Sequence, residues 1–382
     1  MKWDLDPRNV DTGLPLEGVR VLDLSRVLAG PLCAMVLGDL GADVVKVEGP
    51  QGDPVRSLAP PWYRDTATYF LAVNRHRRMV TLDIRQPDDL EKLAQLAELA
   101  DIVIENFLPH QASELGIAHV RDRAPRAVWV TITPSSPGTT ESTQPTFDLL
   151  AQARSGMMSV TGYPDGPPTK VGAPIADVVT GLFATVSAVT GLLARTPDRG
   201  SAIQVPLLES MMSALVNQAQ GYLLTGEEPH RLGNDHPSIA PYGPVAVQDG
   251  SIMLAVGTDA QFAQCDEALG GKLLSHEPRW AENGFRVTDR DRLRRFLEDQ
   301  FKNASVTAVV ATLQARSVPC APILSVADAF GQPAIATGDF VQTAESSLGP
   351  IAMMASPLVW DGVRPAVRFG PAEQGADNDQ FF

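Results

Sequence analysis

The sequence predicts an α/β protein with a Rossmann-like, doubly wound parallel sheet in a large domain and a second, smaller α+β domain. Short apolar runs typical of buried strands alternate with segments of helical periodicity over residues 19–133. A polar stretch at 225–234 then separates this region from a strong hairpin signal. The length of 382 residues and an apolar content of 44% allow a core large enough for two such domains.

The clearest local pattern is the first strand-helix-strand unit. Residues 19–24 are an apolar run typical of a buried strand, and a helix follows at 31–40, starting at Pro31 and ending near Gly41. The next predicted strand is 44–48. A helix that joins two strands over so short a distance forms a right-handed crossover, which makes the strands parallel. The alternation continues with a strand at 79–84, a helix at 87–99 and strands at 102–105 and 128–133.

Three helices are expected after the sheet, at 148–160, 178–195 and 207–224. The run from Val178 to Ala194 has no charged residue, but glycines and hydroxyl groups interrupt it. We therefore expect a buried core helix here and not a membrane span.

The smaller domain is predicted from Asp249-Gly250, which lies between two apolar runs and favours a β-hairpin. Helices are expected near 259–269, 291–301 and 307–316. The polar tail from Gly370 is expected to be loose. The expected bounds are 1–224 for the first part of the large domain, 225–243 for a linker, 244–317 for the small domain and 318–382 for a return to the large domain.

Composition and charge argue against several classes of function. A net charge of −14 does not suit nucleic-acid binding, which requires a concentrated basic face. The three cysteines lack CxxC spacing and the six histidines form no HExxH motif, so we expect neither a disulfide framework nor a metal site. Residues 1–11 lack the apolar segment of a secretory signal, and we expect a cytoplasmic protein without a membrane partner.

The turn after the first strand argues against a dinucleotide site. Between Ser25 and Pro31 the sequence has one glycine, Gly30, whereas the pyrophosphate-binding fingerprint needs three. A serine hydrolase is also disfavoured, because the chain contains no GxSxG elbow.

Several longer motifs follow one another in a characteristic order. They are PLEGVRVLD at 15–23, LGADVVKVE at 40–48, GDPVR at 52–56, LDIR at 82–85, ENF at 105–107, TGYPDGPP at 161–168 and RLGN at 231–234. In this order they resemble the class III CoA-transferases, a family that includes formyl-CoA, oxalate and L-carnitine CoA-transferases and is related to alpha-methylacyl-CoA racemase. The resemblance covers nearly the whole chain. It implies an acyl-CoA:carboxylate CoA-transferase that uses CoA or acyl-CoA as cosubstrate and a small carboxylic acid as partner, with no permanently bound cofactor.

The resemblance places the nucleophile at an aspartate before a long apolar helix, which here is Asp177. Asp177 would attack the donor thioester to give a mixed anhydride and CoA thiolate, and the thiolate would return to form an aspartyl-CoA thioester. From the residues alone, the favoured interpretation of Asp177 is the N-cap of a helix that starts at Val178. The two roles are compatible, because the positive end of a helix dipole favours a carboxylate.

The resemblance also implies a set of CoA contacts. They fall on Leu28, Ala29, Leu82, Asp83, Ile84, Arg85, Asn106, Phe107, Phe147 and Asp148. Core packing is an equally good interpretation of the apolar members of this set. The racemase relative has a proton-transferring histidine at the place of Phe147, and a phenyl ring cannot transfer a proton, so a racemase-like activity is the less favoured alternative.

Several positions depart from the family pattern. Gly49, Leu108, Glu114 and Pro145 stand where relatives often carry arginine or lysine for the CoA phosphates. Arg85 and the basic cluster at 75–78 are candidates to replace these contacts, although a solvated loop is the simpler interpretation of the cluster. A degenerate, non-catalytic paralogue of the same fold is therefore kept as a further alternative.

The resemblance finally implies an obligate homodimer whose two chains are interlocked. The discontinuous layout agrees with it, because the chain leaves the large domain near Pro206 to Tyr242 and returns after Cys320. The sequence does not identify the acyl donor or the acceptor acid.

Overall fold

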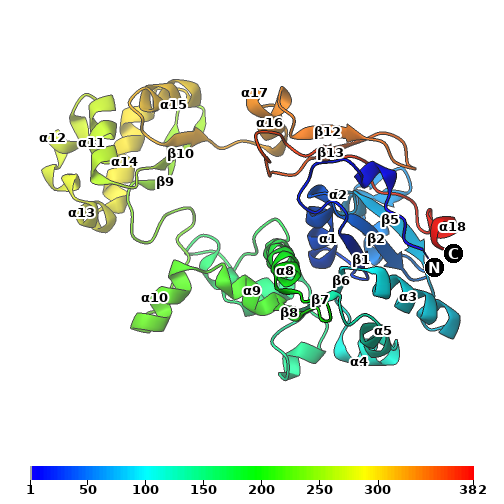
Figure 1. Ribbon diagram of the computed structural model, residues 1–382. Helices are drawn as coiled ribbons and strands as arrows, with labels where there is room; N and C mark the ends of the chain where they lie inside the picture. Colours follow the sequence, from blue (N-terminus) through cyan, green and yellow to red (C-terminus); the bar gives the residue numbers. More distant parts are fainter. Residues whose placement is uncertain (1) are drawn as a thin grey trace. The chain divides into compact units, whose positions relative to one another are not determined.

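The computed structural model describes residues 2–382, which divide into two compact units (Figure 1). Unit 1 contains the residues up to Met157 together with Val171–Gly226 and Pro333–Phe382. Unit 2 contains Met158–Lys170 and Glu227–Gln332. The chain therefore returns to unit 1 after Gln332, whereas the expected boundary lay at 318.

Unit 1 is built on a six-stranded parallel sheet with the strand order β5-β2-β1-β6-β7-β8. The strands are β1 (Arg20–Asp23), β2 (Asp43–Glu48), β5 (Arg77–Thr81), β6 (Ile102–Glu105), β7 (Val128–Thr133) and β8 (Ala202–Pro206). Since the order reverses between β1 and β6, this is the doubly wound arrangement, and the predicted α/β class is confirmed.

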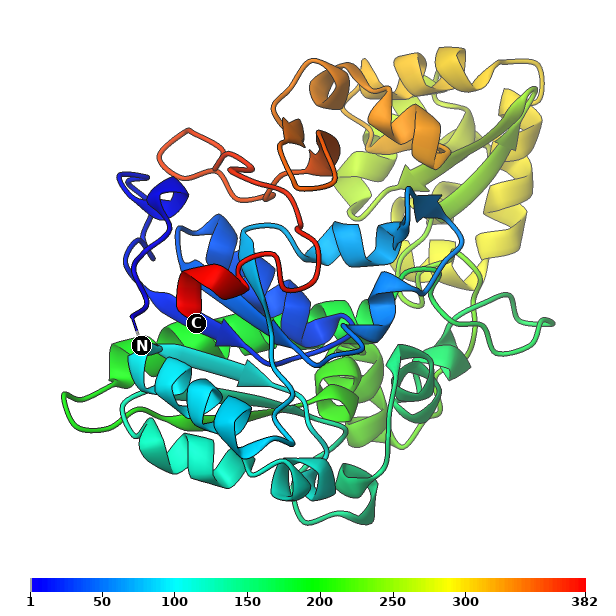
Figure 2. The ribbon, with the colours of Figure 1, turned by 90° about the vertical axis from the view of Figure 1, so that its right-hand side faces the viewer.

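Helices cover both faces of this sheet (Figure 2). Neighbouring strand residues point to opposite faces, so that Leu22 and Val103 pack under α3 (Pro87–Leu99) and α5 (Ile117–Arg123). Val21 and Ile102 pack under α1 (Ala29–Asp39) and α8 (Ile175–Ala194) instead. The chain leaves β1 toward one face and β6 toward the other, which makes their carboxyl ends the topological switch point.

Helix α8 begins three residues earlier than predicted, at Ile175, because the first turn runs through Asp177. Gly181 lets this helix approach α1 closely, since a Cβ atom there would lie 2.7 Å from the Ala29 carbonyl oxygen. By length and composition α8 alone among the described helices is able to cross a membrane. Because it packs on α1 and the sheet, we interpret it as the expected core helix.

Two other predicted helices are each divided. The expected helix at 148–160 is α6 (Asp148–Arg154) and α7 (Met157–Val160), separated at Gly156, whose φ of +87° does not suit a helix. The expected helix at 207–224 is α9 (Leu207–Ser213) and α10 (Asn217–Thr225), separated at Val216.

Strand β5 is an edge strand, and the C-terminal segment covers part of its open edge. The Met79 N–H donates to the Asp377 carboxylate at 2.7 Å, and the Thr81 N–H donates to the Asn378 side-chain oxygen at 2.9 Å. Phe381 is buried against the core. The prediction of a loose tail is therefore wrong for this segment.

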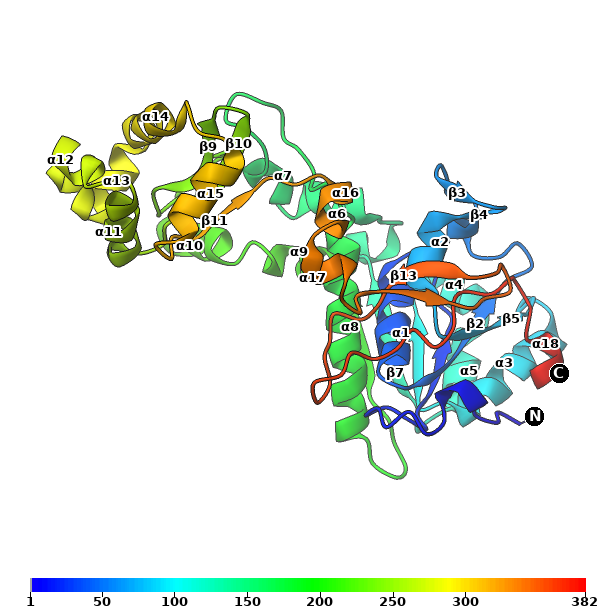
Figure 3. The same cartoon turned by 90° about the horizontal axis from the view of Figure 1, so that it is seen from above.

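Unit 2 contains an antiparallel sheet of β9 (Tyr242–Val247), β10 (Gly250–Ala255) and β11 (Cys320–Pro322) (Figure 3). The pairing of Gly250 with Val247 confirms the predicted hairpin. Its core gathers around the buried Trp280 and Leu297. The helices are α11 (Asp259–Ala268), α12 (Lys272–His276), α13 (Asn283–Thr288), α14 (Arg290–Phe301), α15 (Val306–Gln314), α16 (Val326–Phe330) and the short 3-10 turn Pro278–Ala281.

Short elements complete unit 1. They are β3 (Trp62–Tyr63), β4 (Thr66–Ala67), α2 (Thr68–Val73), α4 (Pro109–Glu114), α17 (Pro333–Ala336), β12 (Val341–Ala344), β13 (Ile351–Met354), α18 (Asn378–Phe381) and 3-10 turns at Pro7–Asn9, Pro54–Arg56 and Thr140–Thr143.

Candidate functional site

A large cavity in unit 1 lies at the switch point of the sheet. It has a volume of about 400 Å³ and is bordered by the turn after β1, the loop after β6 and the first turn of α8. The predicted residues that line it are Leu28, Ala29, Asn106, Phe147 and Asp177. We call it the nucleophile cavity, after the role that the resemblance implies for Asp177. Ligands of doubly wound sheets bind at such a position, because strands of both halves open onto it.

A second cavity of about 230 Å³ lies beside it in the same unit. It is lined by Leu82, Ile84, Arg85 and Phe107, and we call it the distal cavity. Arg26 and Pro54 line both cavities, so the two adjoin. Asp83 and Asp148 line neither of them.

Asp177 lies in the first turn of α8 and is 8% exposed. No described residue donates a hydrogen bond to its carboxylate or forms an ion pair with it. Burial, with a smaller effect from the negative charge of Asp148, raises the pKa of Asp177 to about 7. The side chain therefore lines the cavity without a hydrogen-bond or ion-pair partner among the described residues.

The capping interpretation of Asp177 is wrong, because Asp148 serves that purpose. The Ala176 N–H in the first turn of α8 donates to the Asp148 carboxylate at 2.8 Å. Gln152 donates to the other Asp148 oxygen at 2.8 Å and accepts from the Val171 N–H at 2.8 Å. Asp148 thus holds the segment that carries Asp177 and borders neither cavity, although the resemblance implied a CoA contact for it.

The Asn106 side chain forms two hydrogen bonds with the backbone of the turn after β1. Its side-chain oxygen accepts from the Arg26 N–H at 3.0 Å, and its amide donates to the Arg26 carbonyl at 2.9 Å. The next residue, Val27, has a φ of +74°, which is strained for a β-branched residue. Its N–H donates to the Asp53 carboxylate at 3.3 Å, and Asp53 is ion-paired with the buried Lys46 at 3.0 Å. The strained turn is therefore held from both sides.

The loop after β6 is held in a similar way. The Phe107 N–H donates to the buried Glu105 carboxylate at 2.8 Å, and the Thr131 hydroxyl donates to its other oxygen at 2.6 Å. Burial raises the pKa of Glu105. Phe107 is placed at the wall of the distal cavity by this contact.

The basic cluster at 75–78 does not take part in either cavity. Arg75 is paired with Asp39, Arg77 with Asp23 and Arg78 with Asp43, and all of these arginines are buried. His76 is buried beside Asp39, and burial lowers the pKa of His76 to about 4. The hypothesis that this cluster replaces missing phosphate contacts is wrong, because its arginines are buried and form ion pairs with carboxylates of the core.

The positions that depart from the family pattern border the cavities, apart from Glu114, which is exposed on α4. Leu108 and Pro145 line the nucleophile cavity and Gly49 lines the distal cavity. Among the residues that line the nucleophile cavity, Arg26 carries the one positive charge. Sequence reasoning missed Arg26, although its position in the turn after the first strand of a doubly wound sheet is a recognisable signal.

Tyr69 is a second residue that sequence reasoning missed. It packs against the buried cluster of Leu28, Met35 and Val73, and Leu28 lines the nucleophile cavity. Burial, followed by the negative charge of Asp177, raises the pKa of Tyr69 to about 12. The phenol therefore stays protonated over the physiological range.

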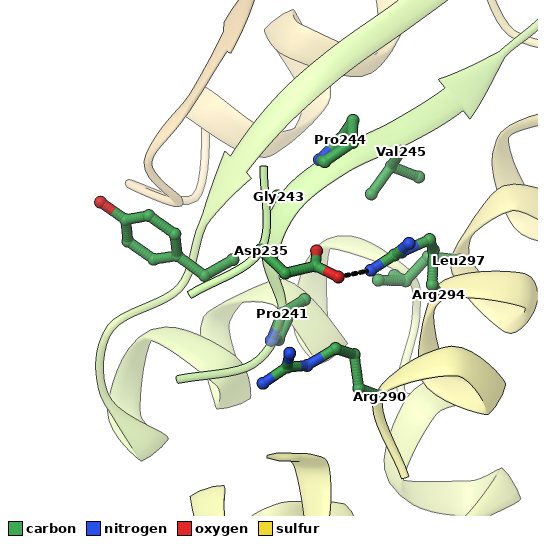
Figure 4. Close-up of a pocket in the computed structure, with 9 residues that line it drawn as sticks. Asp235, Pro241, Gly243, Pro244, Val245, Arg290, Arg294 and Leu297 are labelled. Atoms are coloured by element: carbon green, nitrogen blue, oxygen red, sulfur yellow. Dashed lines mark hydrogen bonds and ion pairs between the residues drawn. The ribbon is translucent and has the colours of Figure 1, made fainter. Parts of the chain in front are cut away.

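Unit 2 has a small cavity of about 20 Å³ beside β9, which is shown in Figure 4. Asp235 and Arg294 form an ion pair across it, and Arg290 lies below. The cavity holds about one water molecule and has no unpaired carboxylate, so it is not a candidate substrate site. Among residues 2–382 no three His, Cys, Asp or Glu side chains are grouped to hold a metal ion.

Comparison with known proteins gives the family of the chain. The model of CoA-transferase family III matches residues 16–378. Succinate–glutarate CoA-transferase of Agrobacterium fabrum is 34% identical over 375 residues, which cover 93% of each protein. Succinyl-CoA:mesaconate CoA-transferase of Haloarcula hispanica is 37% identical over 336 residues, covering 84% of this chain and 83% of that one.

A solved structure gives the same result for the fold. The crystal structure of a CAIB/BAIF family protein from Brucella suis matches with a TM-score of 0.84 and 32% sequence identity, covering 96% of this chain and 98% of that chain. The match to the family model spans residues of both units and, apart from Pro15, every motif from which the resemblance was inferred. This chain therefore belongs to CoA-transferase family III.

Proposed function

We propose that this protein transfers CoA between small carboxylic acids through covalent intermediates on Asp177. The observation that carries the proposal is the unpaired, buried Asp177 carboxylate at the wall of the nucleophile cavity. The relatives of Agrobacterium fabrum and Haloarcula hispanica are named for succinate, glutarate and mesaconate. A small dicarboxylic acid is therefore the substrate class that we propose.

In the first step an oxygen of the Asp177 carboxylate attacks the thioester carbon of the acyl-CoA donor. The carbon–sulfur bond breaks, and the products are an aspartyl mixed anhydride and CoA thiolate. The thiolate then attacks the aspartyl carbonyl, which releases the donor acid as carboxylate and leaves an aspartyl-CoA thioester.

The second half repeats these steps in reverse with the acceptor acid. Its carboxylate attacks the aspartyl-CoA thioester, and the released thiolate takes the acyl group from the new anhydride. The Asp177 carboxylate is thereby regenerated. No net proton is needed, so the site requires no general base.

Burial of Asp177 serves this chemistry. A carboxylate without hydrogen-bond donors is less solvated and is a stronger nucleophile than one in water. The apolar wall of the cavity, which includes Leu28, Leu108 and Ile132, limits the access of water to the two intermediates. The N-terminal end of α8 favours the ionised form of Asp177 and partly opposes the effect of burial.

The distal cavity would take the nucleotide part of CoA. Phe107 and Ile84 offer apolar surface to the adenine ring, and Arg85 offers a charge to the 3′-phosphate. The pantetheine arm would then pass over Leu28 and Ala29 toward Asp177.

We also propose the interlocked homodimer. It is supported by large apolar side chains that are exposed in the single chain, such as Leu193, Val216, Leu223 and Leu224, which are 70–82% exposed. Light scattering at low micromolar concentration should give the mass of a dimer, and a folded, active monomer would contradict the proposal.

The covalent mechanism is tested by trapping. Incubation with succinyl-CoA and hydroxylamine should convert Asp177 to a hydroxamate, detectable by mass spectrometry of the peptide. Asp177→Asn and a sample without the acyl-CoA donor are the controls and should remain unmodified. If the wild-type enzyme transfers CoA but no hydroxamate forms, the nucleophile assignment is wrong. If there is neither transfer nor trapping, the degenerate paralogue is the better description.

A further inference from the structure

We infer that Arg26 binds the diphosphate group of CoA at the junction of the nucleophile cavity and the distal cavity. The inference rests on the proposed function, because it concerns how the same site holds its cosubstrate.

The position of Arg26 between the cavities is the first argument. Arg26 lines both of them, and its guanidinium lies 5.6 Å from the centre of the Phe107 ring at the wall of the distal cavity. If the CoA sulfur is at Asp177 and the adenosine is in the distal cavity, the groups between them must pass this junction. In CoA the diphosphate separates the pantetheine arm from the adenosine.

The availability of its charge is the second argument. Among the described residues, no carboxylate pairs with Arg26 and no acceptor binds its guanidinium. The neighbouring cations are already engaged, because Arg56 donates to Glu48 at 2.8 Å and Lys46 is paired with Asp53 at 3.0 Å. The negative charges of Glu48 and Asp53 on the distal cavity are balanced by these same pairs. Arg85 remains, but it lines the distal cavity alone.

The rigidity of the backbone is the third argument. Asn106 binds both the N–H and the carbonyl of Arg26, at 3.0 and 2.9 Å, although Arg26 is otherwise on an exposed turn. Two hydrogen bonds and the strained Val27 that follows fix where the side chain starts. A guanidinium on a fixed backbone matches two phosphate oxygens with a small loss of conformational freedom.

This assignment also accounts for the departures from the family pattern. Gly49, Leu108 and Pro145 border the cavities without a charge, so the phosphates of CoA must be neutralised by other residues. The whole chain carries a net charge of −14, which makes a local cation more necessary. Arg26 and Arg85 are the two cations that remain available along the path of CoA.

Calorimetry of three ligands with matched variants tests the inference. Arg26→Gln should weaken the binding of CoA and of 3′-dephospho-CoA by the same factor, about 10- to 100-fold. Binding of pantetheine, which lacks the diphosphate, should be unchanged. Arg85→Gln should weaken CoA but not 3′-dephospho-CoA. Arg126→Gln replaces an exposed arginine of unit 1 that lines neither cavity, and it should bind all three ligands like the wild type.

Several outcomes would overturn the inference. Unchanged CoA affinity of Arg26→Gln, together with a raised KM for succinate, would assign Arg26 to the acid substrate. An equal loss for pantetheine would assign it a structural role. If wild-type protein binds no CoA, the proposed function itself fails and the inference falls with it. If circular dichroism shows that Arg26→Gln does not fold, Arg26→Lys is used in its place. The binding of CoA, 3′-dephospho-CoA and pantetheine to that variant is then compared in the same way.

Discussion

Replacing Asp177 by asparagine is expected to abolish transfer and yet to stabilise the protein above pH 7. Burial raises the pKa of Asp177 from the ordinary 3.8 to about 7 in the folded chain. The folded state therefore retains a proton that the unfolded state has lost. The favourable contribution of Asp177 to the free energy of unfolding is complete below pH 3.8 and is lost as the pH rises through about 7. Above that value the ionised carboxylate opposes folding.

The shift sets the size of the effect. At about 1.4 kcal/mol for each pH unit, it corresponds to an upper limit of about 4 kcal/mol. Asparagine has nearly the same shape and does not ionise. We therefore expect Asp177→Asn to raise the free energy of unfolding by about 2 to 4 kcal/mol at pH 8 and to match the wild type near pH 4.

Urea unfolding at several pH values measures this difference. The fluorescence of the buried Trp3 and Trp129 reports on unit 1, which contains Asp177. Asp198→Asn, at an exposed position after α8, is the matched control, and its stability should stay within about 0.5 kcal/mol of the wild type. A difference between Asp177→Asn and wild type that does not change with pH would refute the reasoning, because the carboxylate would then carry no cost of burial.

Three further results are expected. The kcat/KM of the wild type should fall about tenfold per unit as the pH drops below about 7, because protonated Asp177 is not a nucleophile; a profile that stays flat down to pH 5 would exclude this. Asp148→Ala should shift the acid limb of this pH profile to lower pH, because it removes a negative charge near Asp177. Urea unfolding should show that the same variant lowers the free energy of unfolding by about 1 kcal/mol, because the Ala176 N–H loses its acceptor. Asn106→Ala should cost about 1 to 3 kcal/mol of stability by releasing the backbone of Arg26, and calorimetry should show weaker CoA binding.

The sequence allowed the α/β class and the family to be predicted because their signals are local. Strand and helix periodicities at 19–48 and 79–133 are legible in short windows, and a parallel doubly wound sheet follows from their alternation. Leu28, Ala29, Asn106 and Asp177 come together at one cavity because they follow strands, or begin a helix, at the same end of the sheet.

The errors share a different cause, which is pairing between distant segments. The start of α8 was predicted at Val178 because aspartate is a favoured N-cap, but the cap is provided by Asp148 from another helix. The cluster at 75–78 has the composition of a solvated loop, and its arginines are buried because carboxylates from α1, β1 and β2 neutralise them. A short window of sequence around α8 or around 75–78 does not contain these partners, so local patterns could not predict the contacts.

The closing of the β5 edge has a consequence for the synthesis of the protein. Met79 and Asp377, which are hydrogen-bonded, are 298 residues apart in the chain. At translation rates of about 5 to 20 residues per second, Asp377 and Asn378 are synthesised about 15 to 60 s after Met79 and Thr81, whose N–H groups they accept from. During this time the growing chain presents an open strand edge on the ribosome, which other chains can pair with. A truncation that removes residues 377–382 would leave this strand edge open in the finished protein. We expect the truncated protein to aggregate during expression.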